Sequence, residues 1–462
     1  MTNISNNKSW FKTSITARML MVGFLILVLM VPLVFIRNLI EERANRQEEV
    51  ISDINAKWGK ELLVSGPILK VPYNYYTEVV KLDHETKKTF KEKTVKIKYA
   101  YFFPETLSIA SRVNAFKKKY GIYDAAVFTS KMNFTGSFPT IDFADLDIKE
   151  QDVLWEKATF IIQTSNLKGI KESVEILIDK NAYSFVPRYK EPVNDNYASL
   201  PHLNELESIR VDEKSLPISA PINFSFDLTV NGSEQLQFIP IGKETNVTVN
   251  SNWQHPSFQG SFLPDKKVGT EDSKNGFNAE WNVLQINRQF GQSFLGSLPN
   301  LAAFAFGVRL FLPVDQYQKS ERSAKYGYLV IALTFLIFFL IQTISKISIH
   351  PFQYLMIGLA LVMFYTLLIS ISEHQPFFKA YLIAGSAVIV LISLYSFSIL
   401  KNYKFPFLIF SALSALYAFI FIIISLENYA LLVGSTGLFT ILALVMYFSR
   451  KIDWNDHLKP QI

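Results

Sequence analysis

Residues 326–345 read YGYLVIALTFLIFFLIQTIS, a stretch of 20 residues without one charged side chain. Lys325 precedes this stretch and Lys346 follows it, so charges mark both of its ends. An α-helix needs about 20 apolar residues to cross the hydrocarbon core of a bilayer. The sequence therefore predicts a membrane-spanning helix here, and the same pattern can be followed outward in both directions.

Toward the C-terminus, four more uncharged stretches follow, at 352–372, 380–400, 405–426 and 428–449. The short connections between them predict antiparallel neighbours that pack closely, so residues 326–449 are expected to form a five-helix transmembrane bundle. The more polar residues inside the spans, Gln342, Ser370, Ser411 and Ser414, are expected at helix–helix contacts. Ser411 and Ala415 also form a small-x-x-x-small pair that would allow two helices to approach closely.

Toward the N-terminus, residues 19–37 form a sixth apolar span that ends on Phe35-Ile36-Arg37. That ending lacks the small-x-small pattern of a cleavage site, so we interpret the span as an uncleaved anchor rather than a signal peptide. Pro32 is expected to kink it near its end. The charged segment 38–58 is typical of a helix and is expected to continue the span as a stalk.

The distribution of Lys and Arg predicts the orientation of the six spans, because cytoplasmic loops are enriched in both residues. With the N-terminus inside, the inner segments carry nine of them and the short outer loops carry only Lys379. We therefore expect cytoplasmic tails at 1–18 and 450–462, and an extracytoplasmic domain at 38–325. The nine are Lys8, Lys12, Arg18, Lys346, Lys401, Lys404, Arg450, Lys451 and Lys459.

The intervening domain at 38–325 is expected to be rich in β-strands. Apolar and polar residues alternate around 95–101, 158–162 and 224–230, as they do in strands with one buried face. Asn231-Gly232 follows the last run and predicts a hairpin turn. The sequence thus favours a polytopic α-helical membrane protein of six spans (1 + 5) with a large β-rich extracytoplasmic domain, either sandwich-like or α+β.

A weak internal similarity separates two segments of this domain by 48 residues. Gly121-Ile122 with Asp124 matches Gly169-Ile170 with Glu172. Two copies of one strand–turn–strand unit and a chance similarity between β segments are equally compatible with it.

Composition limits the functions that the chain can have. The domain at 38–325 holds 35 basic and 36 acidic residues, so nothing in its charge favours nucleic acid as a partner. The chain has no Cys, which excludes disulfides, thiolate metal sites and a Cys nucleophile. No phosphate-binding, dinucleotide-binding or metalloprotease motif occurs. The sequence therefore predicts no cofactor, no metal and no enzymatic activity.

Two clusters and one isolated residue are candidates for binding or coupling. The first cluster joins Trp253, His255 and Phe258 with Trp281, and could stack on a sugar or grip a peptide; core aromatics beside a turn are the alternative. The second is Glu373 with His374, which could bind a metal or sense pH, or merely cap two spans.

The isolated candidate is Tyr317, which precedes the second span in a segment that could couple the domain to the bundle. A solvated helix start is the alternative reading of that segment.

Eight short segments spread along the chain form a specific combination: VPL at 31–33, IEER at 40–43, SGPILKVPY at 65–73, WQHPSFQG at 253–260, FLPVDQY at 311–317, KYG at 325–327, HPFQY at 350–354 and SISEH at 370–374. In these segments the chain resembles the CreD family, cell-envelope integrity proteins of the Gram-negative inner membrane. The resemblance covers nearly the whole chain, with two departures: an acid expected near the inner end of the second span is Gln342, and an expected basic-Gly-Ile turn reads Lys119-Tyr120-Gly121.

The resemblance implies a role in envelope stress with links to a two-component regulator, colicin tolerance and the β-lactam response, but no reaction. We expect a non-enzymatic protein of the inner membrane that is embedded in the lipid bilayer and binds an envelope protein or a cell-wall component. The first alternative is a transporter or flippase-like membrane unit gated by the outer domain. An extracytoplasmic hydrolase that uses carboxylates is the second.

Overall fold

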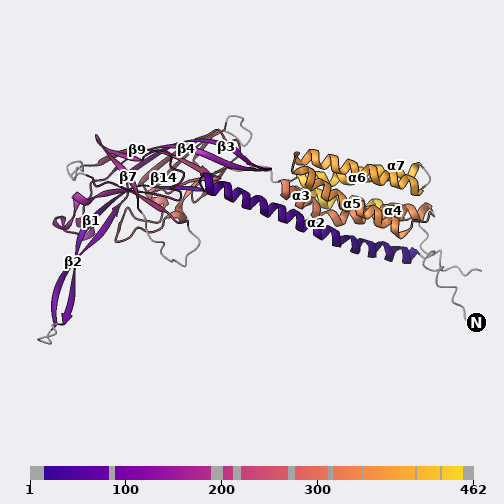
Figure 1. Cartoon of the computed structure of the whole chain (residues 1–462), viewed down its shortest axis with the longest axis horizontal. Helices are drawn as coiled ribbons and strands as arrows, with labels where there is room; N and C mark the ends of the chain where they lie inside the picture. The colour runs from indigo at the N-terminus through magenta and orange to yellow at the C-terminus, as the bar shows by residue number, and fades with distance from the viewer. Residues whose placement is uncertain are drawn as a thin grey trace, which may run out of the picture. The chain divides into compact units, whose positions relative to one another are not determined.

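The computed structural model of the chain describes residues 15–82, 89–188, 201–211, 220–268, 276–310, 312, 316–345, 347–400, 403–426 and 429–450. The chain separates into two compact units, one of residues 1–49 with 314–462 and the other of residues 50–313 (Figure 1). The first unit holds the apolar helices and the second holds the strands, so each is described by itself.

Helix α2 runs from Ile15 to Trp58 without interruption and continues through Pro32. The apolar run at 19–37 and the charged segment at 38–58 are therefore one helix. Its last turns belong to the strand unit, where Ile54 packs on Ala125 and Val127. Trp58 closes the helix there, with its indole Nε1 donating to the carbonyl oxygen of Phe128 at 3.3 Å.

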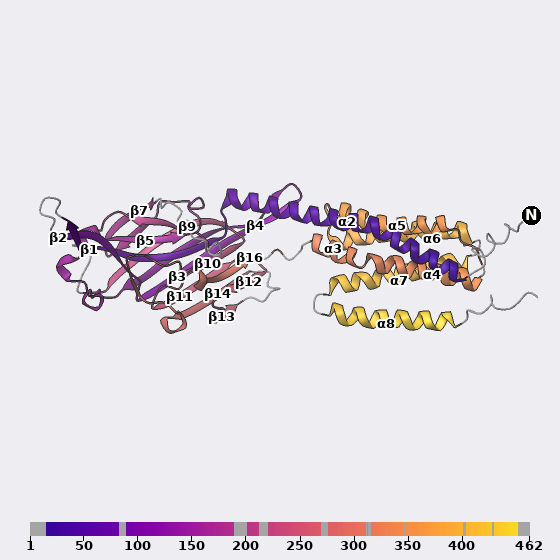
Figure 2. The same ribbon diagram turned by 90° about the horizontal axis from the view of Figure 1, so that it is seen from below.

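Six helices of the described residues are long and apolar enough to cross a membrane, one near the N-terminus and five near the C-terminus. This confirms the predicted fold class, and Figure 2 shows the C-terminal helices side by side. A short polar helix, α3, precedes the five. The bounds are α3 Gln316–Lys325, α4 Gly327–Ser345, α5 Pro351–Ser372, α6 Phe377–Leu400, α7 Lys404–Ser425 and α8 Ala430–Ser449.

Small residues and hydrogen bonds between helices hold the helices together, and one contact of each kind involves α5. Gly358 of α5 lies against Leu29 of α2, where any side chain on the glycine would clash. Tyr354 of α5 donates its phenol hydrogen to the Oε1 atom of Gln342 on α4 at 2.7 Å. Both residues are buried, so the bond satisfies polar groups that lipid could not. The predicted helix–helix role of Gln342 is confirmed.

Close packing fails at α8, the last helix. Half of the apolar window of α4 is buried, but none of that of α8. Ser411 and Ala415 of α7 were expected at a tight helix contact, and this prediction is wrong. Both are exposed to a cavity between α4, α7 and α8.

The strand unit holds sixteen strands among its described residues. They are β1 Leu62–Leu82, β2 Thr89–Phe102, β3 Thr106–Tyr120, β4 Tyr123–Phe138, β5 Thr159–Thr164, β6 Glu175–Ile178, β7 Asn181–Arg188, β8 Asn204–Ser208, β9 Ile222–Ser233, β10 Gln235–Phe238, β11 Glu244–Ser251, β12 Pro256–Gly260, β13 Lys266–Val268, β14 Phe277–Leu284, β15 Ser293–Leu295 and β16 Phe306–Leu310.

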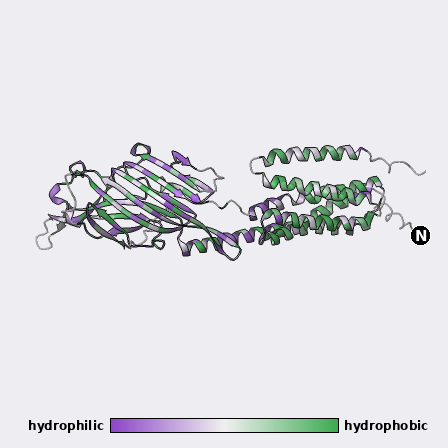
Figure 3. Ribbon diagram, turned by 90° about the horizontal axis from the view of Figure 1, so that it is seen from above, coloured by the Kyte–Doolittle hydropathy of each residue, from purple (hydrophilic) through white to green (hydrophobic). Residues whose placement is uncertain are grey.

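These strands follow one path, β12-β16-β10-β1-β5-β8-β7-β6-β9-β4-β3-β11-β14-β13, with β2 and β15 attached beside β1. The path divides into two halves, one from β12 to β7 and the other from β6 to β13. The two halves enclose one apolar core, because aromatic rings from opposite halves touch. Phe138 lies 5.5 Å from Phe160, and Trp281 lies 5.6 Å from Phe306, between ring centroids. Apolar and polar residues alternate along the strands (Figure 3), so the architecture is sandwich-like.

The hairpin predicted at Asn231-Gly232 does not form. Both residues lie inside β9, where they pair with Thr129 and Phe128 of β4. The chain leaves β9 only at Ser233, and β10 then pairs with β1 and β16 in the other half of the path. The aromatic ring of Phe128 covers the glycine so closely that no Cβ would fit. The glycine therefore serves packing and not a turn.

The similarity between segments 48 residues apart does not correspond to a repeated unit. Gly121 lies in the tight turn between β3 and β4 with a φ of 63°. Gly169 instead lies in the connection from β5 to β6, where its carbonyl oxygen accepts a hydrogen bond from the backbone N–H of Asn231. The two segments have different neighbours and different conformations.

Candidate binding face on the strand domain

The solvent side of five neighbouring strands, β9, β4, β3, β11 and β14, is covered with polar side chains. We call this surface the polar sheet face. Strand register places its residues in rows of directly opposed partners. One row is Asp227, Asn133, Ala110, Thr248 and Glu280, and the adjacent row is Thr229, Lys131, Arg112, Asn250 and Asn278.

Two cations lie directly opposite each other at the centre of this face. Arg112 of β3 pairs in register with Lys131 of β4, and both side chains are exposed. Within the described part of the chain, neither side chain takes part in an ion pair. Like charges opposite each other in a sheet are destabilising because their Cβ atoms are only about 4.5–5.5 Å apart. The position therefore favours an anion that neutralises both.

The two acids that line the same space as these cations are Asp227 of β9 and Glu172 of the connection between β5 and β6, and both are engaged by neutral groups. The Nδ2 atom of Asn133 donates to Oδ1 of Asp227 at 2.8 Å. The hydroxyl of Thr229 donates to Oε2 of Glu172 at 3.4 Å. Together with the cations and the amides of the second row, these groups line a hollow of about 760 Å³. The hollow offers two cations, two carboxylates, amides and hydroxyls. Because the carboxylates are bonded to neutral groups and not to the cations, this set suits a ligand that is rich in hydroxyl groups and carries an oxyanion for Arg112 and Lys131.

The candidate aromatic cluster packs in the core instead of facing this hollow. Trp281 of β14 is 2% exposed and Trp253 is 8% exposed. Phe258 of β12 lies edge-on to Trp281 at 5.7 Å, which joins the two ends of the strand path. His255 is half-buried beside them. A ligand could reach Trp281 only by displacing core side chains, so the binding role of this cluster stays a prediction.

The other three candidates lie in the helical unit. Tyr317 is buried in α3. Glu373 ends α5, and its Oε1 atom lies 3.7 Å from Nη1 of Arg43 on α2. His374 is exposed beside it. The ion pair gives Glu373 a structural partner, while the coupling role of these residues stays a prediction. No group of three or more metal-ligating side chains occurs among the described residues.

A second charged group in the strand unit is a buried network around Glu207 of β8. Lys70 Nζ lies 2.9 Å from one carboxylate oxygen, to which the Thr159 hydroxyl also donates, and Arg188 Nε lies 2.7 Å from the other oxygen. Burial by itself raises the pKa of Glu207, but the bonds from Lys70 and Thr159 and the charge of Arg188 outweigh it, so the pKa is lowered.

Burial also raises the pKa of the nearby Tyr101 phenol to about 12, with the charges of Glu205 and Glu207 adding to the shift. The carboxylate of Glu207 is thus fully occupied by its neighbours. The network holds β1, β5, β7 and β8 together and leaves this carboxylate no free oxygen for chemistry.

Sequence reasoning missed the polar sheet face altogether. Alternation around 224–230 identified polar positions on one strand but not their neighbours on the next. Arg112 and Asn250 are 138 residues apart in the chain and become partners only through the parallel pairing of β3 with β11. The excess of Ser, Thr and Asn at alternate positions of each strand was the available signal.

Comparison with known proteins gives two results. A family model described as "Inner membrane protein CreD" matches residues 14–455. The curated protein "Inner membrane protein CreD" of Escherichia coli (strain K12) is 29% identical over 439 residues, which cover 95% of this chain and 93% of that protein. Both matches extend through the helical unit and the strand unit.

Proposed function

The chain belongs to the CreD family of multi-pass inner membrane proteins, and on that premise we propose that it acts as a non-enzymatic binding protein in cell-envelope integrity. In this proposal the strand unit faces the periplasm and binds the cell wall through the polar sheet face. The opposed cations Arg112 and Lys131 are the observation that carries the proposal.

The proposed ligand is a peptidoglycan segment, because its chemistry matches the hollow. Carboxylates of the stem peptides would neutralise the two cations, and bonds from an arginine or lysine to a carboxylate are among the stronger hydrogen bonds. Sugar hydroxyls would bond to the amides of Asn250 and Asn278, which line the same hollow. The absence of exposed aromatics among the residues that line the hollow favours polar recognition over stacking on sugar rings.

A binding assay with isolated cell walls tests the proposal. Full-length protein in detergent is mixed with purified peptidoglycan sacculi, and the fraction that co-sediments is measured. The double variant Arg112→Gln/Lys131→Gln should lose at least ten-fold in apparent affinity. Wild-type binding should also weaken as salt rises, because exposed charges are screened.

A matched control removes the same amount of charge elsewhere on β3. Lys117→Gln/Lys119→Gln changes two exposed lysines near the end of β3 and should bind as the wild type does. An equal loss of affinity in both double variants would mean that binding depends only on net charge, and it would refute a defined site. Wild-type protein that does not co-sediment with sacculi would refute the cell-wall ligand.

The proposed orientation can be tested independently because the chain has no Cys. A single cysteine at Ser108 in β3, which is exposed on the polar sheet face, should react with a membrane-impermeant maleimide added to cells with a permeabilised outer membrane. A cysteine at Arg450 should react only after the inner membrane is opened. The reverse pattern would place the strand unit in the cytoplasm.

A further inference from the structure

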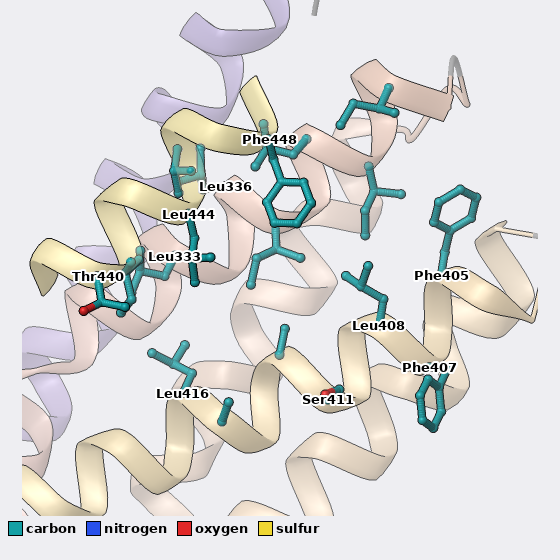
Figure 4. A pocket seen from close by; sticks show the side chains of 18 of the residues that line it. Leu333, Leu336, Phe405, Phe407, Leu408, Ser411, Leu416, Thr440, Leu444 and Phe448 are labelled. Carbon is teal, nitrogen blue, oxygen red and sulfur yellow. The ribbon is translucent and has the colours of Figure 1, made fainter. Parts of the chain in front are cut away.

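The helical unit contains an apolar crevice of about 1060 Å³ between α4, α7 and α8. Figure 4 shows its walls, with Leu333 and Leu336 on α4, Leu408 and Leu416 on α7, and Leu444 and Phe448 on α8. Cavities that hold small molecules in proteins measure about 300–1,000 Å³, so the crevice is large enough for a sizeable ligand. Almost all of the side chains that line it are apolar.

Contacts near the first half of α8 close one end of the crevice. A Cβ added at Gly437 would clash with the ring of Phe419 on α7, so the two helices touch there. Gly434, one turn earlier, also faces α7, with Ile423 Cδ1 3.8 Å from the position of its missing Cβ. Beyond Gly437 the lining side chains of α8 are larger, and they border the cavity and not α7.

The crevice is as long as one leaflet of a bilayer is thick. Its lining on α8 extends from Gly437 to Phe448, which corresponds to about 17 Å at the rise of an α-helix. The hydrocarbon core of a bilayer is about 30 Å thick, so one leaflet contributes roughly 15 Å. Acyl chains that belong to one leaflet therefore match the length of the crevice.

Positive charge lies at the open end of the crevice. Lys404 lines it at the start of α7. Arg450 follows the last turn of α8 at the same end, with its guanidinium 4.2 Å from the centroid of the Tyr447 ring, outside the lining. Basic groups between the ends of transmembrane helices are the usual binding sites for anionic lipid head groups.

We propose that this crevice binds one anionic phospholipid from the leaflet on the Lys404 side. Its acyl chains lie between α7 and α8 along the wall of α4, and its phosphate group lies beside Lys404. The lipid covers the inner side of α8, which has few protein neighbours of its own. Such a site makes the packing of the last helix depend on the lipid composition of the membrane.

Native mass spectrometry of the full chain in mild detergent tests this proposal. Delipidated protein is titrated with phosphatidylglycerol or with phosphatidylcholine of the same acyl chains. We expect saturation at one phosphatidylglycerol per chain, with at least ten-fold weaker binding of phosphatidylcholine. Ala415→Trp fills the crevice from α7 and should lower the affinity for phosphatidylglycerol at least ten-fold. Lys404→Gln should reduce only the preference between the two head groups.

The matched control is Leu391→Trp, which adds a similar volume at a residue of α6 that is 56% exposed and lies outside the crevice. This variant should bind both lipids as the wild type does. If Ala415→Trp fails to fold, Thr440→Trp fills the same space from α8.

Three lipid-binding results would overturn the proposal, and one result on oligomeric state would do so as well. The three are equal binding of the two lipids, non-saturating binding of several lipids, and unchanged binding by a correctly folded crevice variant. A stable dimer that excludes lipid would assign the crevice to a second copy of the chain and would also overturn it.

Discussion

Replacing Glu207 by Gln should destabilise the strand unit by about 3 kcal/mol at pH 7. The substitution keeps the shape of the side chain but removes the charge that faces Lys70 and Arg188. Breaking a buried ion pair by removing one partner costs about 3–5 kcal/mol. The Lys70 side chain is 16% exposed, so partial hydration places the expected value at the lower end. Arg188 is 59% exposed and adds less than about 1 kcal/mol.

The pH dependence of this loss follows from the lowered pKa of Glu207. The carboxyl of an unfolded glutamate has its ordinary pKa of 4.5, and the folded value lies below it. The stabilisation is therefore complete above about pH 4.5 and decreases as the pH falls through the folded-state pKa. The difference between wild type and Glu207→Gln should shrink in the same range.

Urea unfolding of the full chain in detergent, followed by tryptophan fluorescence, measures both effects. Trp58, Trp155, Trp253 and Trp281 all belong to the strand unit, so they report mainly on it. With a urea slope of about 3 kcal/mol per molar, the midpoint should fall by roughly 1 M at pH 7. Glu156→Gln, which removes an exposed partner of Lys157, should change it little. A loss below about 1 kcal/mol, or one unchanged from pH 7 to pH 3.5, would refute the reasoning.

Three further predictions concern packing and the bundle. Gly232→Ala should destabilise the strand unit by about 1–3 kcal/mol in the same urea assay, because the new methyl group meets the buried ring of Phe128. Trp281→Ala should cost about 3–5 kcal/mol by that assay, and a stability unchanged from wild type would mean that the indole is not core. Arg43→Ala and Glu373→Ala, combined in a double-mutant cycle of thermal unfolding, should give a coupling below about 1 kcal/mol, since Arg43 is 42% exposed.

The membrane part of the fold was predictable from sequence because each span is marked locally, by its length and by charges at its ends. The strands were recognisable for a similar reason, since alternation is a local pattern. Their neighbours were not, because pairings such as β3 with β11 join segments more than a hundred residues apart. Asn231-Gly232 illustrates the limit: the dipeptide has the composition of a turn, but the β4 partner strand and the Phe128 ring determine its conformation.

The candidate site residues show the same difference between local patterns, which the sequence reveals, and contacts that only the fold creates. Aromatic clustering in the sequence identified Trp253, Phe258 and Trp281, but the same composition serves a core, and two of the three are buried. The cations of the polar sheet face are separated by 19 residues along a hairpin and have no distinctive motif. Only the register of β3 with β4 makes Arg112 and Lys131 neighbours.

The position of β16 in the sheet has a consequence for how the protein is made. β16 lies between β10 and β12, yet it is the last strand of the unit in the chain and ends at Leu310. A nascent chain therefore exposes the edges of β10 and β12 until almost all of the strand unit has been synthesised. Such late, long-range pairing slows folding and leaves unpaired edges open to aggregation. The edges of β10 and β12 that pair with β16 thus stay unpaired from their own synthesis until shortly before synthesis of the second membrane span.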